Sequence, residues 1–120
     1  MELIQASRNG HTDIVDLLLD NGADPNITDN YGMTPLTIAS LRGHIDIVRL
    51  LLENDADPNI QSNRGTTPLI GSSMLGNIDI VRLLLNHGVN PNFISIEGAT
   101  ALIKASRNGH TDIVDLLLDN

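Results

Sequence analysis

The sequence contains no cysteine and no tryptophan, and the only aromatic residues among its 120 are Tyr31 and Phe93. Without cysteine, neither a disulfide-stapled scaffold nor a thiolate metal site is possible, and we expect a reducing compartment, the cytoplasm. Hydrophobic residues nevertheless make up 41% of the chain. The core must therefore be built from leucine, isoleucine, valine and alanine, which suits helices that pack closely together.

Positive charge is scarce as well, because 7 lysines and arginines stand against 15 aspartates and glutamates and give a formal net charge of -8. A field of this sign repels phosphate backbones and anionic lipids, whereas nucleic-acid-binding domains usually carry a clustered basic face. Residues 1–5 lack the basic and apolar segments of a signal peptide, and no apolar run approaches the roughly 20 residues that span a bilayer. We therefore expect a soluble protein whose partner is neither nucleic acid nor a membrane.

What the sequence does contain is a repeat of 33 residues, whose most regular markers are Gly10, Gly43, Gly76 and Gly109. Each glycine opens a segment in which an Ile-Val pair is followed by three leucines, over residues 10–19, 43–52, 76–85 and 109–118. The apolar positions recur at helical spacing and predict the longer helix of each unit. A glycine and a proline follow it, as in residues 21–26 and 87–92, and predict where this helix ends.

A second, shorter helix is predicted to begin at Thr34-Pro35 and again at Thr67-Pro68. Threonine accepts a capping hydrogen bond at such a position, and proline suits the first turn, where its missing amide donor is no loss. Thr100 occupies the equivalent position without a following proline, which weakens the signal there. The polar, glycine-containing residues 28–32 predict a projecting turn or hairpin between units.

The second unit carries its motifs in a fixed order, as Thr34-Pro35-Leu36, Gly43-His44, Ile47-Val48, Leu50-Leu51-Leu52 and Ala56-Asp57-Pro58-Asn59. With these motifs in register, essentially the whole chain resembles the ankyrin repeat family. The resemblance implies an all-α solenoid of stacked helix-turn-helix pairs with projecting hairpin loops, about four units in a single domain, 1–120. The expected units are residues 1–28, 29–61, 62–94 and 95–120, of which the first and last are incomplete.

Several positions depart from the family pattern. The family's histidine after Thr-Pro-Leu ties adjacent units by hydrogen bonds, and packing must take over its role here, since these positions hold Ile4, Thr37, Ile70 and Ile103. Asp55 stands where Gly22 and Gly88 end other long helices, so a left-handed conformation there would carry a cost that glycine avoids. Gly71 lies inside a short helix, at about 1 kcal/mol relative to alanine. We expect the third unit to be the least stable.

No nucleophile elbow, phosphate-binding loop or H-E-x-x-H motif occurs in the sequence, and we expect neither catalysis nor a cofactor. A histidine precedes an aspartate by two residues in three units, a pair that could bind a metal or share a proton. The recurrence of this pair at one repeat position, with Asn77 in the third unit, favours residues that start a helix. The three histidines are His11, His44 and His110.

Two columns of charge follow from the repeat. The first column lies in the predicted first turns of the long helices, where the macrodipole favours an anion: Asp13, Asp46, Asp79 and Asp112. These four carboxylates lie too far apart to share a calcium ion. The other predicts ion pairs between units, each contributing about 0–1 kcal/mol, which join Asp16 to Arg49 and Arg82 to Asp115.

The family resemblance implies that a partner binds on the hairpin tips and on the concave face of the short helices. The tip positions are Asn30, Tyr31, Met33, Asn63, Arg64, Thr66, Ile96, Glu97 and Ala99. The short-helix positions are Arg8, Leu41, Arg42, Met74, Leu75 and Arg107. Tyrosine and arginine are enriched in hot spots, so we expect the anchors to be Tyr31, Arg42 and Arg64. For Leu41, Met74 and Leu75, packing between units is as well supported as partner contact.

The sequence thus predicts a protein–protein interaction module that recognises a folded partner or an extended segment. The alternative is a structural element that self-assembles, because residues 3–21 match residues 102–120 at every position but one, Gln5 against Lys104. Both ends therefore have the sequence pattern of internal repeats. We expect a monomer, with end-to-end association as the alternative, and Asp115 would face Asp16 of the next copy and oppose it.

Overall fold

The computed structural model describes residues 2–120, and within them the chain forms eight helices and no strand. They are α1 (Glu2–Asn9), α2 (Thr12–Asp20), α3 (Pro35–Arg42), α4 (Ile45–Glu53), α5 (Pro68–Leu75), α6 (Ile78–Asn86), α7 (Ala101–Arg107) and α8 (Thr111–Leu118). The all-α prediction is confirmed. None of these helices is long and apolar enough to cross a membrane.

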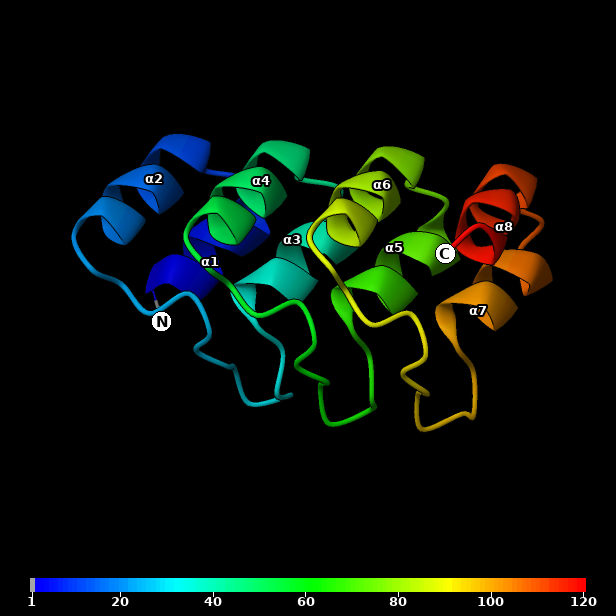
Figure 1. Ribbon diagram of the computed structural model, residues 1–120. Coiled ribbons are helices and arrows are strands. Elements are labelled where there is room, and N and C mark those ends of the chain that lie inside the picture. The colour runs from blue at the N-terminus through cyan, green and yellow to red at the C-terminus, as the bar shows by residue number, and fades with distance from the viewer. Residues whose placement is uncertain (1) are drawn as a thin grey trace.

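The helices form two layers (Figure 1). The short helices α1, α3, α5 and α7 lie side by side in one layer, the long helices α2, α4, α6 and α8 form the other, and loops project from one edge. The exposed side of α1, α3, α5 and α7 is called the short-helix face below. Neighbours in this layer pack more closely than the long helices do, because small residues such as Ala39, Ser40 and Ser73 are fully buried there.

The core lies between the two layers and repeats with the sequence. Ile47, Ile80 and Ile113 occupy one repeat position in three successive long helices, and each is 0% exposed. Their equivalent Ile14 is 47% exposed, because no helix pair covers that side of α2 among the described residues. Burial of each isoleucine therefore depends on the neighbouring unit, as expected of a solenoid.

The predicted helix starts and stops are confirmed. Thr34, Thr67 and Thr100 each accept a hydrogen bond of 3.2 Å from the amide three residues later, so Thr100 caps α7 without the help of a proline. Asp55 follows α4 with a φ of 64°, the only positive φ of a non-glycine residue within residues 2–120. Its left-handed conformation matches those of Gly22 and Gly88 at the equivalent positions.

The ion pairs predicted between units are wrong. Arg49 Nη1 lies 3.3 Å from Asp46 Oδ1 of its own helix and not on Asp16, and Arg82 Nη1 lies 3.5 Å from Asp79 Oδ1 and not on Asp115. Residues three apart on one helix are about 5–6 Å apart at Cβ, whereas packed helices are about 8–10 Å apart at their axes. Each arginine therefore pairs with the aspartate of its own helix, which is the nearer one.

The histidines start the long helices as predicted, and two of them also join units. His44 Nε2 donates to the Arg8 carbonyl oxygen at 3.2 Å, and His110 Nε2 donates to that of Met74 at 3.0 Å. Gly10 makes room for this contact, since a Cβ atom there would lie 2.8 Å from the His44 ring. These hydrogen bonds supplement the packing that was expected to replace the family's histidine network.

Candidate partner-binding surface

Each projecting loop is closed by the side-chain oxygen of its first residue. Asp29 Oδ1 accepts hydrogen bonds of 2.9 Å from the amides of Tyr31 and Met33. Ser62 takes the same role in the second loop, where its hydroxyl accepts from the amides of Arg64 and Thr66. Short polar side chains at the start of such loops imitate a backbone turn, which explains why these residues form tight tips.

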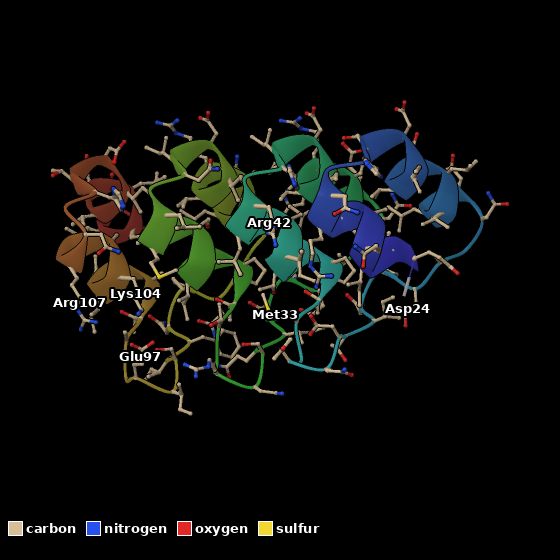
Figure 2. All side chains as sticks on the ribbon, turned by 180° about the vertical axis from the view of Figure 1, so that it is seen from behind. Asp24, Met33, Arg42, Glu97, Lys104 and Arg107 are labelled. Atoms are coloured by element: carbon tan, nitrogen blue, oxygen red, sulfur yellow. The ribbon has the colours of Figure 1, made fainter. Side chains whose placement is uncertain are left out.

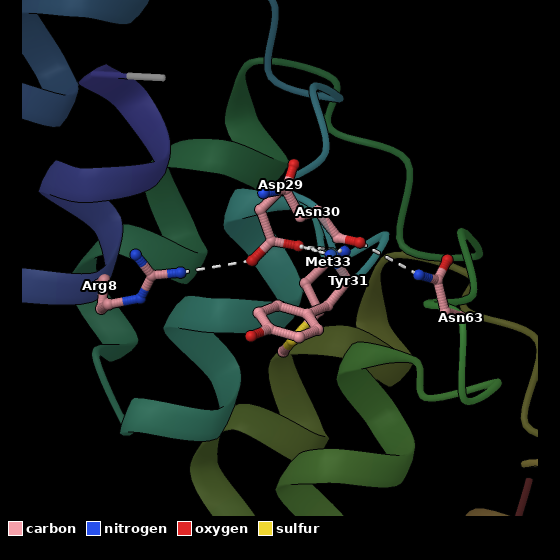
Figure 3. A network of polar contacts seen from close by, with 6 residues as sticks. All are labelled: Arg8, Asp29, Asn30, Tyr31, Met33 and Asn63. Carbon is pink, nitrogen blue, oxygen red and sulfur yellow. Dashed lines mark hydrogen bonds and ion pairs between the residues drawn. The ribbon is translucent and has the colours of Figure 1, made fainter.

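The tips are also joined to one another, as Figure 3 shows for the first two. The Asn63 amide donates to the Tyr31 carbonyl oxygen at 2.9 Å, and Asn63 Nδ2 donates to that of Asn30 at 3.2 Å. The Ile96 amide donates to the Arg64 carbonyl oxygen at 2.8 Å and continues the row. Backbone bonds therefore hold the tip side chains in a fixed register.

An ion pair fixes the first tip to the helices. Arg8 Nη2 of α1 lies 3.3 Å from Asp29 Oδ2, and the Asp29 side chain is only 8% exposed (Figure 3). A partly buried pair with hydrogen bonds to backbone amides contributes more than an exposed one. Arg8 was predicted to contact a partner, but its guanidinium is engaged in positioning the loop that carries Tyr31.

A pocket of about 340 Å³ lies between the first two tips and the short helices α3 and α5. Its lining residues are Tyr31, Met33, Leu41, Ser62, Asn63, Arg64, Thr66 and Met74. All but one of these stand among the positions predicted for partner contact. The exception is Ser62, whose hydroxyl closes the second loop; its place in the repeat, equivalent to that of Asp29, is the signal that marks it as a loop residue.

The pocket owes part of its shape to Gly71 in α5. A Cβ atom at position 71 would lie 2.7 Å from Leu41 Cδ2, so the Leu41 side chain fills the space that a larger residue would need. Leu41 and Met74 are both half-buried and line the pocket, and they therefore take part in packing and leave apolar surface open. Leu75 is 53% exposed and lies outside the pocket lining.

The remaining predicted positions are dispersed. Ile96 is 72% exposed at the third tip, whereas Ala99 is 1% exposed and cannot touch a partner. Glu97 Oε1 lies 3.3 Å from Lys104 Nζ of α7, a pair that sequence reasoning missed. Figure 2 shows this pair and Arg107 toward the C-terminal end of the stack, whereas Arg42 lies nearer its middle.

Charge is separated between the two layers. The long helices contain eight carboxylates and two arginines, Arg49 and Arg82, both of which are paired within their own helix. The short helices contain four cations and a single carboxylate, Glu2. Among the described residues, three cations form no ion pair, and all three lie on the short helices or a tip: Arg42, Arg64 and Arg107.

The sequence matches a family model described as ankyrin repeats (3 copies) in two segments, residues 3–62 and 54–120. Together these segments span every described helix except the first residue of α1. A comparison with curated proteins gave no match.

Proposed function

Because the chain belongs to the ankyrin repeat family, whose repeats are generally protein–protein interaction modules, we propose that it binds another protein through its hairpin tips and short-helix face. The observation that carries this proposal is the pocket between the first two tips. Tyr31, which is 71% exposed, stands at its edge, and the unpaired Arg64 stands beside it. Tyrosine and arginine dominate binding hot spots.

Hydrogen bonds fix the loops that carry Tyr31 and Arg64, and this order favours a role in binding. Tyr31 and Arg64 lie on loops whose backbones are closed by Asp29 and Ser62 and joined by interloop hydrogen bonds. A surface ordered before it meets its partner loses less conformational entropy on binding. The row of hydrogen bonds between the tips therefore supports the proposed binding surface.

We further infer that the protein is not an enzyme and uses no cofactor. The family is a non-catalytic interaction fold. Within residues 2–120, no group of three or more histidines, aspartates or glutamates is arranged to hold a metal ion. The recurring histidines already have a structural role, since His44 and His110 bond to backbone carbonyl oxygens.

The test is affinity capture with the wild-type protein, the double variant Tyr31→Ala/Arg64→Ala, and a matched control, Arg49→Ala/Arg82→Ala, on the long helices. Circular dichroism first establishes that all three fold alike. We expect the pocket variant to lose at least one protein that both the wild type and the control retain. Recovery of the same proteins by all three would refute the proposed surface.

The alternative function, self-assembly, is motivated by apolar side chains at the two ends of the stack. Ile14 is 47% exposed at one end, and Ile103 and Leu118 are 40% and 67% exposed at the other. The residues equivalent to Ile103, Ile4 and Ile70, are 2% and 3% exposed. Sedimentation equilibrium distinguishes self-assembly from partner binding by a monomer. A mass of 12.9 kDa that does not change with concentration excludes self-assembly. A mass that rises with concentration, and that Leu118→Asp returns to the monomer value, supports it.

A further inference from the structure

We propose that the pocket takes an apolar side chain from an extended, acidic segment of the partner, whose flanking carboxylates pair with Arg64 and with the other unpaired cations of the short-helix face. This inference rests on the proposed function and specifies the chemistry of the partner. It commits the pocket to a peptide segment that carries both an apolar anchor and negative charge.

The wall of the pocket is largely apolar. Tyr31, Met33, Leu41 and Met74 offer a phenol ring, two thioethers and a branched alkyl group from one loop and two helices. A volume of about 340 Å³ is near the lower end of the roughly 300–1,000 Å³ of small-molecule pockets, which suits one or two side chains better than a large cofactor. Methionine is adaptable in shape and is common at surfaces that bind apolar side chains.

Unpaired cations lie in and beside the pocket and farther along the short-helix face. Arg64 lines the pocket, and its guanidinium has no carboxylate partner among the described residues. Arg42 follows the pocket residue Leu41 on α3, and Arg107 extends the positive charge to α7 (Figure 2). Because Arg42 and Arg107 lie on α3 and α7, with α5 packed between these helices, they favour an extended segment, which advances about 3.3 Å per residue.

The rest of the molecule reinforces this preference. The long helices carry eight carboxylates in a protein of net charge -8. An acidic segment is repelled from that layer and attracted to the short-helix face, so the field of the whole protein directs it to one side. Arg8 and Lys104 are already paired with Asp29 and Glu97, so the positive charge open to a ligand is confined to the three unpaired arginines.

Nucleic acid would satisfy the same arginines through phosphate oxygens, but the protein suits it poorly. Single-stranded nucleic acid binds grooves in which successive aromatic side chains stack on bases. Here Tyr31 is the only aromatic residue in the pocket lining. Long polyanions would also meet the repulsion of the overall negative charge. Oligonucleotide binding is therefore kept as a competing outcome of the test.

The test is a selection from a displayed library of random twelve-residue peptides against the folded, full-length chain, followed by affinity measurements by fluorescence anisotropy at two salt concentrations. We expect the selected peptides to carry aspartate or glutamate on both sides of a leucine, isoleucine, methionine or aromatic residue. Their affinity should fall by about tenfold with Arg64→Gln and should weaken with added salt. Arg49→Gln, which removes a cation from the long helices, should change affinity less than twofold.

Three results would overturn the inference: no selected peptide, selected peptides without acidic enrichment, or tighter binding of a labelled oligothymidine than of any peptide. Replacing the anchor residue of a selected peptide by glycine should abolish binding, and retention of binding would reject the apolar anchor. Peptides that depend on Tyr31 and Met74 but lack acidic residues would leave the proposed function standing while rejecting its acidic specificity. Affinity capture that is insensitive to Tyr31→Ala/Arg64→Ala would instead reject the surface itself.

Discussion

Replacing Asp55 by glycine should stabilise the protein. Asp55 has a φ of 64° and is exposed, and no hydrogen bond to its side chain is formed among the described residues. A left-handed backbone costs a residue with a side chain about 1–2 kcal/mol, with aspartate near the lower limit. The carboxylate also lies beside the C-terminal end of α4, where the macrodipole disfavours an anion by about 0.3–1 kcal/mol.

Glycine loses part of this advantage because its unfolded chain is more flexible, an effect of about 0.4–1 kcal/mol. We therefore expect Asp55→Gly to raise the free energy of unfolding by about 1 kcal/mol, or the melting temperature by about 4 °C in a chain of this size. Urea unfolding followed by circular dichroism measures it, with an unchanged m-value as the check that only stability has altered.

Two further variants separate the cost of the left-handed backbone at Asp55 from the effect of its charge. Asp55→Asn removes the charge and keeps a side chain that tolerates the left-handed region, so it should recover about half of the gain. Gly88→Asp imposes the reverse change at a position where a Cβ atom would meet no other atom within 4 Å, and it should cost about 1 kcal/mol. If Asp55→Gly does not raise the free energy of unfolding and Gly88→Asp does not lower it, the left-handed backbone at the ends of the long helices does not limit stability.

Three further stability predictions use the same urea assay. His44→Ala should cost about 1 kcal/mol because it removes the bond to the Arg8 carbonyl oxygen, whereas His11→Ala, at an exposed equivalent position, should change stability by less than about 0.5 kcal/mol. Thr100→Ala should cost about 1 kcal/mol through loss of the α7 cap, and an unchanged midpoint would refute that role. Asp29→Ala should cost about 2 kcal/mol and speed hydrogen exchange at the Tyr31 and Met33 amides, so protection equal to the wild type would show that the tip closes without Asp29.

Local signals in the sequence were sufficient for the helices. Thr34, Thr67 and Thr100 cap as predicted because capping is decided within three residues of chain. Asp55 takes the left-handed conformation because the fold demands it at every equivalent position, whichever residue stands there. Such features depend on short-range geometry that a 33-residue repeat makes easy to align.

Contacts between units were harder to predict. The acceptor of His44 is a carbonyl oxygen 36 residues earlier, which is one repeat plus three residues, and only the stacked geometry gives that separation a meaning. The opposite error concerned Arg49: the repeat suggested Asp16, one full unit away, although Asp46 stood three residues earlier in the same helix. An exposed arginine pairs with the nearest carboxylate, and helical spacing was the better guide.

The candidate pocket was largely predictable in its residues but not in its depth. Tip and short-helix positions that vary between units gave seven of the eight lining residues. That Leu41 and Met74 stay open while Leu75 points elsewhere depends on packing between α3 and α5, which periodicity does not specify. The ion pairs of Arg8 and Glu97 likewise require the loops to be placed in space.

Gly71 links the stability of α5 to the shape of this pocket. By helix propensity alone, the glycine costs about 1 kcal/mol relative to alanine. In the folded chain, however, Leu41 Cδ2 occupies the place beside it, and a Cβ atom there would come within 2.7 Å. Alanine at position 71 would therefore push the Leu41 side chain of α3, which lines the pocket, out of its present place. A stronger α5 and an open pocket therefore compete at one position, which gives a physical reason for a helix-weakening residue to lie beside the surface proposed to bind a partner.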